Sequence, residues 1–151
     1  MKRDKREIQI KKIESYLRAY ETYKLGIINL QKQLDYIMPN VTASYELREG
    51  STGTFNIKSD TEKYAIDRIE SKKALIIHED IERYKIIINS IDEAMKGLND
   101  IERDFIKYRY FKRQQINQIM DTLGYSEKYI FTIRNHIMNK LLISLKGLLQ
   151  F

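Results

Sequence analysis

Apolar residues recur at alternating steps of three and four along the first 38 positions of the chain. This spacing predicts an amphipathic helix over about residues 6–38, with the stripe of a coiled-coil seam or of a helical hairpin. Its members are Ile13, Tyr16, Tyr20, Tyr23, Ile27, Leu30, Leu34 and Ile37. Pro39, the single proline, follows at once and predicts the end of the helix there.

The pattern loosens over residues 39–59, which we interpret as a connector that is partly ordered at most. Glycine, serine and threonine fill residues 50–54 and disfavour a helix. The alternation of Val41, Ala43, Tyr45 and Leu47 allows a short strand, although a lone strand is marginal.

A second long helix is predicted over about residues 59–98. Ser59 and Glu62 have the spacing of a capping box at its start. Its stripe repeats the three-four spacing through Ile77, Ile81, Tyr84, Ile88, Ile91, Met95 and Leu98. Two such helices pack most simply as an antiparallel pair, whereas pairing of one or both stripes with a second subunit stays open.

Three further helical segments follow, separated by short breaks. Asn99 and Glu102 have capping-box spacing for a helix over residues 100–111, and a short helix is predicted over residues 116–123. Gly124 ends that helix and Ser126 caps a long last one. So short a turn predicts a steep crossing that frees the first turns of the last helix for a DNA major groove. The prediction is an all-α protein with a helical N-terminal domain, residues 1–98, and a C-terminal helix-turn-helix domain, residues 99–151.

The net positive charge of the chain favours DNA as a partner. The chain has 27 basic and 21 acidic residues, a net charge of +6. From residue 100 onward 9 basic residues face 5 acidic ones, so most of the excess lies beside the predicted helix-turn-helix. Phosphate neutralisation needs such an excess, although small proteins are often basic without binding DNA.

Several functional classes are disfavoured. The chain has no cysteine, hence no disulfide or thiolate metal site, which fits a reducing compartment. The basic N-terminus lacks an apolar segment behind it and no apolar run is long enough to span a bilayer, so we expect a cytoplasmic protein without membrane contact. The two histidines lack ligand spacing, and neither a phosphate-binding glycine loop nor a nucleophile motif occurs. We therefore expect no enzymatic activity, no cofactor and no metal.

The C-terminal pattern resembles the region 4 helix-turn-helix of sigma-70-type factors. The matching run is Leu98-x2-Ile101-Glu102-x3-Ile106-x3-Tyr110, then Ile116-x2-Ile119-x3-Leu123-Gly124-x-Ser126-x3-Ile130-x2-Ile133-x6-Lys140-Leu141. With its long helical N-terminal part, the whole chain resembles phage-encoded late transcriptional regulators of the ArpU/RinA type. The resemblance implies a sequence-specific regulator, an activator of phage or prophage late genes, that binds promoter DNA, with host RNA polymerase as a candidate second partner.

The same resemblance assigns candidate DNA contacts. Base contacts are expected on the exposed side of the last helix, and phosphate contacts around the turn and before residue 116. The base-contacting candidates are Glu127, Lys128, Tyr129, Phe131, Thr132 and Asn135; the phosphate-contacting candidates are Lys107, Lys112, Arg113, Gln114, Ser126 and Arg134. Sigma factors often carry arginine at the positions of Glu127, Tyr129 and Phe131, so the base preference here must differ.

Two other functions stay open. A small terminase-like DNA-packaging subunit also joins a helix-turn-helix to helical oligomerisation elements, although usually with the helix-turn-helix first. The alternative is a polymerase- or sigma-interacting protein that does not itself read DNA. A homodimer through the heptad stripes would enlarge the contact area that a lone helix-turn-helix offers DNA.

Overall fold

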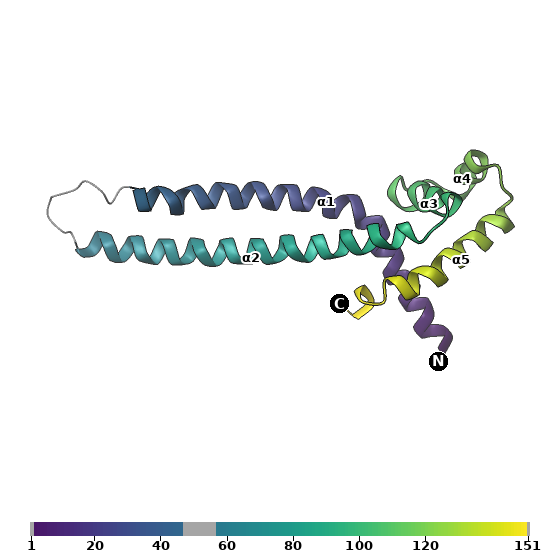
Figure 1. Ribbon diagram of the computed structural model, residues 1–151, viewed down its shortest axis with the longest axis horizontal. Helices are drawn as coiled ribbons and strands as arrows, with labels where there is room; N and C mark the ends of the chain where they lie inside the picture. Colours follow the sequence, from purple (N-terminus) through teal and green to yellow (C-terminus); the bar gives the residue numbers. More distant parts are fainter. Residues whose placement is uncertain (1, 47–56, 151) are drawn as a thin grey trace. The chain divides into compact units, whose positions relative to one another are not determined.

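The chain is all-helical in a computed structural model that describes residues 2–46 and 57–150. Within these ranges the side chains are described for every residue except 2, 38–46, 57–61, 63 and 64. Its helices are α1 (Lys2–Glu46), α2 (Ile57–Lys96), α3 (Asp100–Ile106), the π-helix η1 (Lys107–Phe111), α4 (Ile116–Leu123), α5 (Glu127–Ser144) and the 3₁₀ helix η2 (Leu148–Gln150) (Figure 1). The described residues contain no strand, so the predicted all-α class is confirmed.

The ends of the two long helices differ from the prediction. The helix α1 continues through Pro39 to Glu46, so both the predicted stop at Pro39 and the predicted strand near Val41 are wrong. A proline inside a helix removes one backbone hydrogen bond, but each further residue of a helix that is already formed adds one. The strand's last member, Leu47, and residues 50–54 lie outside the described part of the chain. The helix α2 begins at Ile57, so Ser59 lies inside it and is not its cap.

The contacts divide the chain into two compact units, residues 1–24 with 86–151 and residues 25–85. The prediction placed the division between residues 98 and 99. In the structure, both the first part of α1 and the last part of α2 belong with the C-terminal helices. Sequence patterning shows that these parts have an apolar face, but it does not show which helices cover that face.

The first unit has a continuous apolar core drawn from nearly all of its helices. Ile13 and Leu17 of α1 are fully buried, as are Phe105 and Tyr110 around η1 and Ile119 of α4. The other buried members are Tyr20, Ile87, Ile88, Ile91, Ala94, Leu98, Ile106, Ile130, Ile133, Ile137, Met138, Leu141, Leu145 and Leu148. Burial of this extent stabilises the fold by about 25 cal/mol for each Å² of apolar surface.

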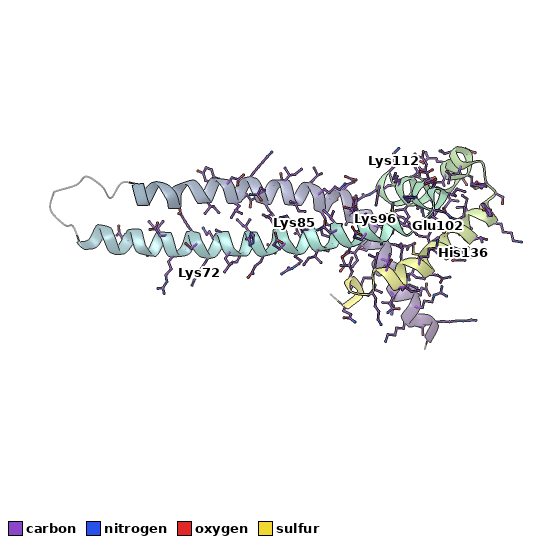
Figure 2. All side chains as sticks on the ribbon, viewed as in Figure 1. Lys72, Lys85, Lys96, Glu102, Lys112 and His136 are labelled. Carbon is purple, nitrogen blue, oxygen red and sulfur yellow. The ribbon has the colours of Figure 1, made fainter. Side chains whose placement is uncertain are left out.

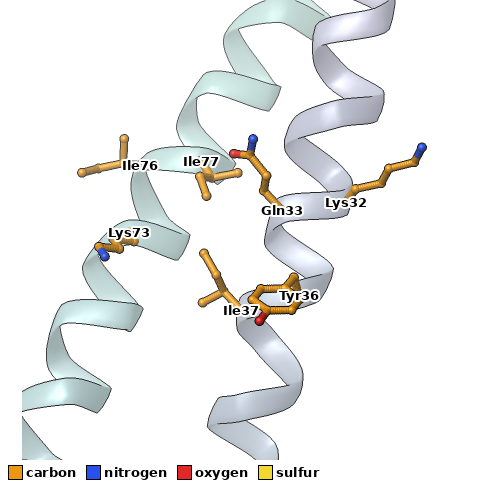
Figure 3. A pocket seen from close by; sticks show the side chains of 7 residues that line it. All are labelled: Lys32, Gln33, Tyr36, Ile37, Lys73, Ile76 and Ile77. Carbon is orange, nitrogen blue, oxygen red and sulfur yellow. The ribbon is translucent and has the colours of Figure 1, made fainter.

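The second unit is a pair of helical segments from α1 and α2 that run side by side in opposite directions (Figure 1). Ile37 and Ile77 point toward the facing helix (Figure 3). A Cβ at Gly26 would lie 3.2 Å from the ring of Tyr84, so the backbones approach closely there. The predicted heptad stripes therefore face each other within this hairpin.

A second apolar row of the hairpin stays open to solvent. Ile66, Ile69, Ile76 and Tyr36 are 54–78% exposed. Tyr36 and Ile76 also line an open groove of about 540 Å³ (Figure 3). A hairpin of two helices can cover one stripe of each helix but not a second.

Candidate nucleic-acid interface

The connection between α4 and α5 has the geometry that its sequence predicts. Gly124 adopts a left-handed conformation with a φ of 73°, and its N–H donates to the carbonyl oxygen of Met120 at 2.8 Å. The Ser126 Oγ accepts a hydrogen bond from the backbone N–H of Tyr129 at 3.3 Å. Both caps are confirmed, and they fix where α4 ends and where α5 begins.

The helix α5 has one buried face. Ile130, Ile133, Ile137, Met138 and Leu141 are all buried in the first unit. Successive residues of an α-helix are about 100° apart around its axis, so these five side chains define one side of α5. The charged and polar residues between them have to point elsewhere.

The opposite side of α5 is a polar stripe formed by Lys128, Thr132 and Asn135, all exposed. Their spacing of four and three residues aligns them within about 60° around the axis. The Thr132 hydroxyl donates to the Lys128 carbonyl oxygen at 3.0 Å, which restrains the rotation of this exposed side chain. The stripe offers one cation, one amide and one methyl group on a single exposed face.

Three other base-contacting candidates lie near the start of α5. Glu127 is exposed in the first turn, and Tyr129 and Phe131 are 45% and 44% exposed. The Tyr129 ring packs against the Tyr125 ring with centroids 4.7 Å apart. All six base-contacting candidates are therefore solvent-accessible, with Tyr129 and Phe131 on the two flanks of the polar stripe.

The segment before α4 is held by backbone contacts, and it carries several of the phosphate candidates. Arg113 has a φ of 55°, unusual for a residue other than glycine, and its guanidinium donates to the carbonyl oxygen of Arg18 at 3.3 Å. The Gln114 carbonyl oxygen accepts from Arg109 at 3.0 Å, while its own side-chain Oε1 is buried without a partner among the described residues. Lys107 and Lys112 are both exposed. Lys112, labelled in Figure 2, has its Nζ 4.9 Å from the centroid of the Tyr108 ring.

A cap at the start of α4 was missed from the sequence. The Gln115 backbone N–H donates to the Gln118 side chain at 3.0 Å, and the Gln118 backbone N–H is capped in return by the Gln115 side chain. Glutamine is a rare cap, because serine, threonine, aspartate and asparagine are preferred there. The reciprocal spacing of three residues was the signal that could have revealed it.

Arg134, one of the candidate phosphate contacts, is paired with a carboxylate. Its Nη2 and Nε lie 2.6 and 3.2 Å from Glu14 Oε1, and Glu14 also accepts from the Tyr110 hydroxyl at 2.8 Å. The guanidinium of Arg134 is thus paired with a carboxylate of α1, and its expected phosphate contact stays a prediction. Glu14 precedes Arg134 by 120 residues, and no local sequence signal connects them.

Charge stabilises this cluster of Glu14, Tyr110 and Arg134. Burial alone would raise the pKa of Glu14, but the hydrogen bonds from Arg134 and Tyr110 outweigh it and lower that pKa. Burial, together with the neighbouring Glu14 carboxylate, raises the pKa of Tyr110 well above its usual value. Glu14 is therefore charged and Tyr110 neutral throughout the physiological range.

A second ion pair joins α3 to α5. Glu102 is 6% exposed, and Lys140 Nζ lies 3.0 and 2.8 Å from its two carboxylate oxygens. The same carboxylate accepts from the Asn99 backbone N–H, which confirms the predicted capping box. Two carboxylates, the partly buried Glu14 of α1 and the buried Glu102 of α3, thus position α5 from different sides.

The structure describes no group of three or more histidine and acidic side chains able to hold a metal ion. None of the helices that it describes is both long and apolar enough to cross a membrane. Comparison of the chain with protein-family models, with curated proteins and with solved structures gives no match.

Proposed function

We propose that the chain is a sequence-specific DNA-binding regulator of transcription, in which α4 and α5 act as a helix-turn-helix and α5 reads bases. The observation that carries the proposal is the polar stripe of Lys128, Thr132 and Asn135 opposite the buried face of α5. A lysine can donate to guanine, an asparagine can pair with adenine, and a threonine methyl can contact thymine. The resemblance to ArpU/RinA-type regulators adds activation of phage or prophage late genes to this proposal.

The caps of the two helices support the same function. Gly124 and Ser126 permit a three-residue turn, after which the first two turns of α5 carry exposed side chains. The Ser126 Oγ accepts from Tyr129, so its own proton remains available to a phosphate oxygen. Glu127, the one acid in the first turn, would select a cytosine amino group and repel phosphate.

Dimerisation belongs to the proposal as well, because one helix-turn-helix offers DNA little contact area. The heptad stripes face each other inside the hairpin, whereas a second apolar row is open to solvent. We assign the dimer contact to the open row of Ile66, Ile69, Ile76 and Tyr36. Two copies paired through this row would form a four-helix bundle.

The test is selection of duplexes from a random library, followed by fluorescence anisotropy across a salt series. We expect a preferred duplex to bind roughly a thousandfold more tightly than a scrambled one, with a steep salt dependence. Asn135→Ala should weaken the preferred complex by roughly 10- to 100-fold and leave scrambled DNA nearly unchanged. Asn89→Ala changes an exposed asparagine of α2 and serves as the matched control.

Equal, weak binding to every duplex would refute base reading by α5. Docking on RNA polymerase or on a sigma factor would then be the remaining role for the exposed Tyr129 and Phe131. Ring-shaped assemblies on sizing, with binding insensitive to sequence, would instead favour a DNA-packaging subunit.

A further inference from the structure

A basic depression lies in the first unit, between α1 and η1. It has a volume of about 440 Å³ and is lined by Lys24, Lys107 and Lys112 together with Tyr20 and Phe111. The two rings stack with centroids 4.4 Å apart, and Lys24 Nζ lies 4.3 Å from the centroid of Tyr20. Lys24 precedes Lys107 and Lys112 by more than 80 residues, so the fold rather than the sequence brings it to them.

The charges of the depression are unbalanced. Glu21 is the only acid in its lining, and its carboxylate lies 3.8 Å from Lys24 Nζ, with both side chains about half exposed. Within the described part of the chain, no ion pair joins Lys107 or Lys112 to a carboxylate. The lining itself therefore holds three lysines and one glutamate, and Asp92, bonded to Tyr20, adds a carboxylate behind the ring near Lys24.

The π-helix explains why Lys107 and Lys112 occur together. The Lys112 N–H donates to the Lys107 carbonyl oxygen at 2.8 Å, a bond across five residues. In an α-helix, residues five apart differ by about 140° around the axis, whereas a π-turn brings them close to alignment. This π-turn thus puts two cations on one side of the chain, and π-turns frequently occur at functional sites.

Tyr20 and its partners fix the third cation. The Tyr20 hydroxyl donates to Asp92 Oδ1 at 2.5 Å, which anchors the ring on which Lys24 rests. The hydrogen bond with Tyr20 raises the pKa of Lys24, so its ammonium group stays charged. Mutual repulsion of the three cations weakens when an anion enters between them.

We propose that Lys24, Lys107 and Lys112 form a phosphate-binding site, and that its phosphate is a backbone phosphodiester of the DNA bound by α5. This assignment of the source rests on the proposed function. It extends the DNA contact to α1, far from the helix-turn-helix in sequence. A phosphate on a free nucleotide or pyrophosphate shares the same chemistry, and the two arms of the experiment separate these sources.

The first arm measures duplex binding against salt for Lys24→Gln/Lys107→Gln. We expect equal weakening on preferred and scrambled duplexes, and a slope of log K against log salt that is smaller by about 1 to 2. The matched control is Lys5→Gln/Lys146→Gln, which removes two exposed lysines of the same unit away from the depression. Circular dichroism checks that both double variants fold.

The second arm titrates the full chain with pyrophosphate and follows the amide NMR signals of the three lysines. If the slope of log K against log salt is smaller for Lys24→Gln/Lys107→Gln but not for the control, the phosphate at the site is a DNA phosphate. Saturable pyrophosphate binding with an unchanged slope would overturn that source and assign the site to a free ligand. If pyrophosphate shifts none of the three amide signals and the salt slope is also unchanged, the three lysines do not form a phosphate-binding site. A wild-type chain that binds no duplex refutes the proposed function, and the pyrophosphate titration then decides the site alone.

Discussion

Replacing Glu14 by glutamine tests how α5 is held against α1. Glu14 Oε1 accepts from Arg134 and from Tyr110, and the side chains of Glu14 and Arg134 are only 12% and 29% exposed. Glutamine keeps the shape and one acceptor but removes the charge. Arg134 is then left as a partly buried cation without a counter-charge, the situation that makes a broken buried pair costly.

The magnitude follows from the hydrogen bonds to charged groups that are lost. Such bonds contribute about 1.5–3 kcal/mol each, and one neutral acceptor remains, so we expect a loss of about 2 kcal/mol in the free energy of unfolding. For a chain of this size that corresponds to a decrease in Tm of roughly 4–8 °C. Urea and thermal unfolding followed by circular dichroism measure both quantities.

Glu7→Gln is the matched control on the same helix. Glu7 pairs with Lys11 at 3.5 Å, but the two side chains are 67% and 72% exposed. Surface pairs of this kind typically contribute about 0–1 kcal/mol, so Glu7→Gln should leave unfolding nearly unchanged. Equal stabilities for the Glu14 and Glu7 variants would refute the reasoning, because the buried pair would then contribute no more than a surface pair.

The pH dependence gives a second check on Glu14. Its pKa is lower in the folded chain than in the unfolded one, so its contribution is complete above the unfolded value of about 4.3. That contribution is lost as the pH falls through the lowered folded value. The stability difference between wild type and Glu14→Gln should therefore be constant near neutral pH and shrink toward zero in acid. A difference that persists undiminished in strong acid would contradict the assigned charge interaction.

Three other predictions follow from the backbone and the surface. Gly124→Ala should destabilise the chain by about 1 kcal/mol, because its φ is positive, whereas Gly147→Ala should be neutral; thermal unfolding compares them. Arg113→Gly should keep or slightly raise the stability, measured by unfolding, because glycine relieves the positive φ. The same variant should weaken DNA binding, measured by anisotropy, because it removes a cation. Ile69→Glu should convert the proposed dimer to a monomer without loss of helix, as judged by sedimentation and circular dichroism, and a wild-type monomer at high concentration would contradict the dimer.

The local features of the C-terminal half could be predicted from the sequence. Asn99 with Glu102, Gly124 and Ser126 act through hydrogen bonds to groups at most four residues away, so their spacing alone carries the information. The buried side of α5 also followed from periodicity, because a helix has a single period and its apolar positions define one face. The helix limits at Pro39 and Ser59 could not be predicted, since weak end signals compete there with continuation of a long helix.

Only the tertiary structure decided which distant groups meet. Periodicity shows that α1 has an apolar stripe, but that stripe fits the C-terminal helices and a facing helix equally well. The structure divides it between the two, with residues 1–24 in one unit and the rest in the other. That division is what brings Glu14 to Arg134 and Lys24 to Lys107. Such contacts depend on how helices pack rather than on spacing along the chain, so the sequence by itself determined the helices and their faces, and packing decided which faces meet.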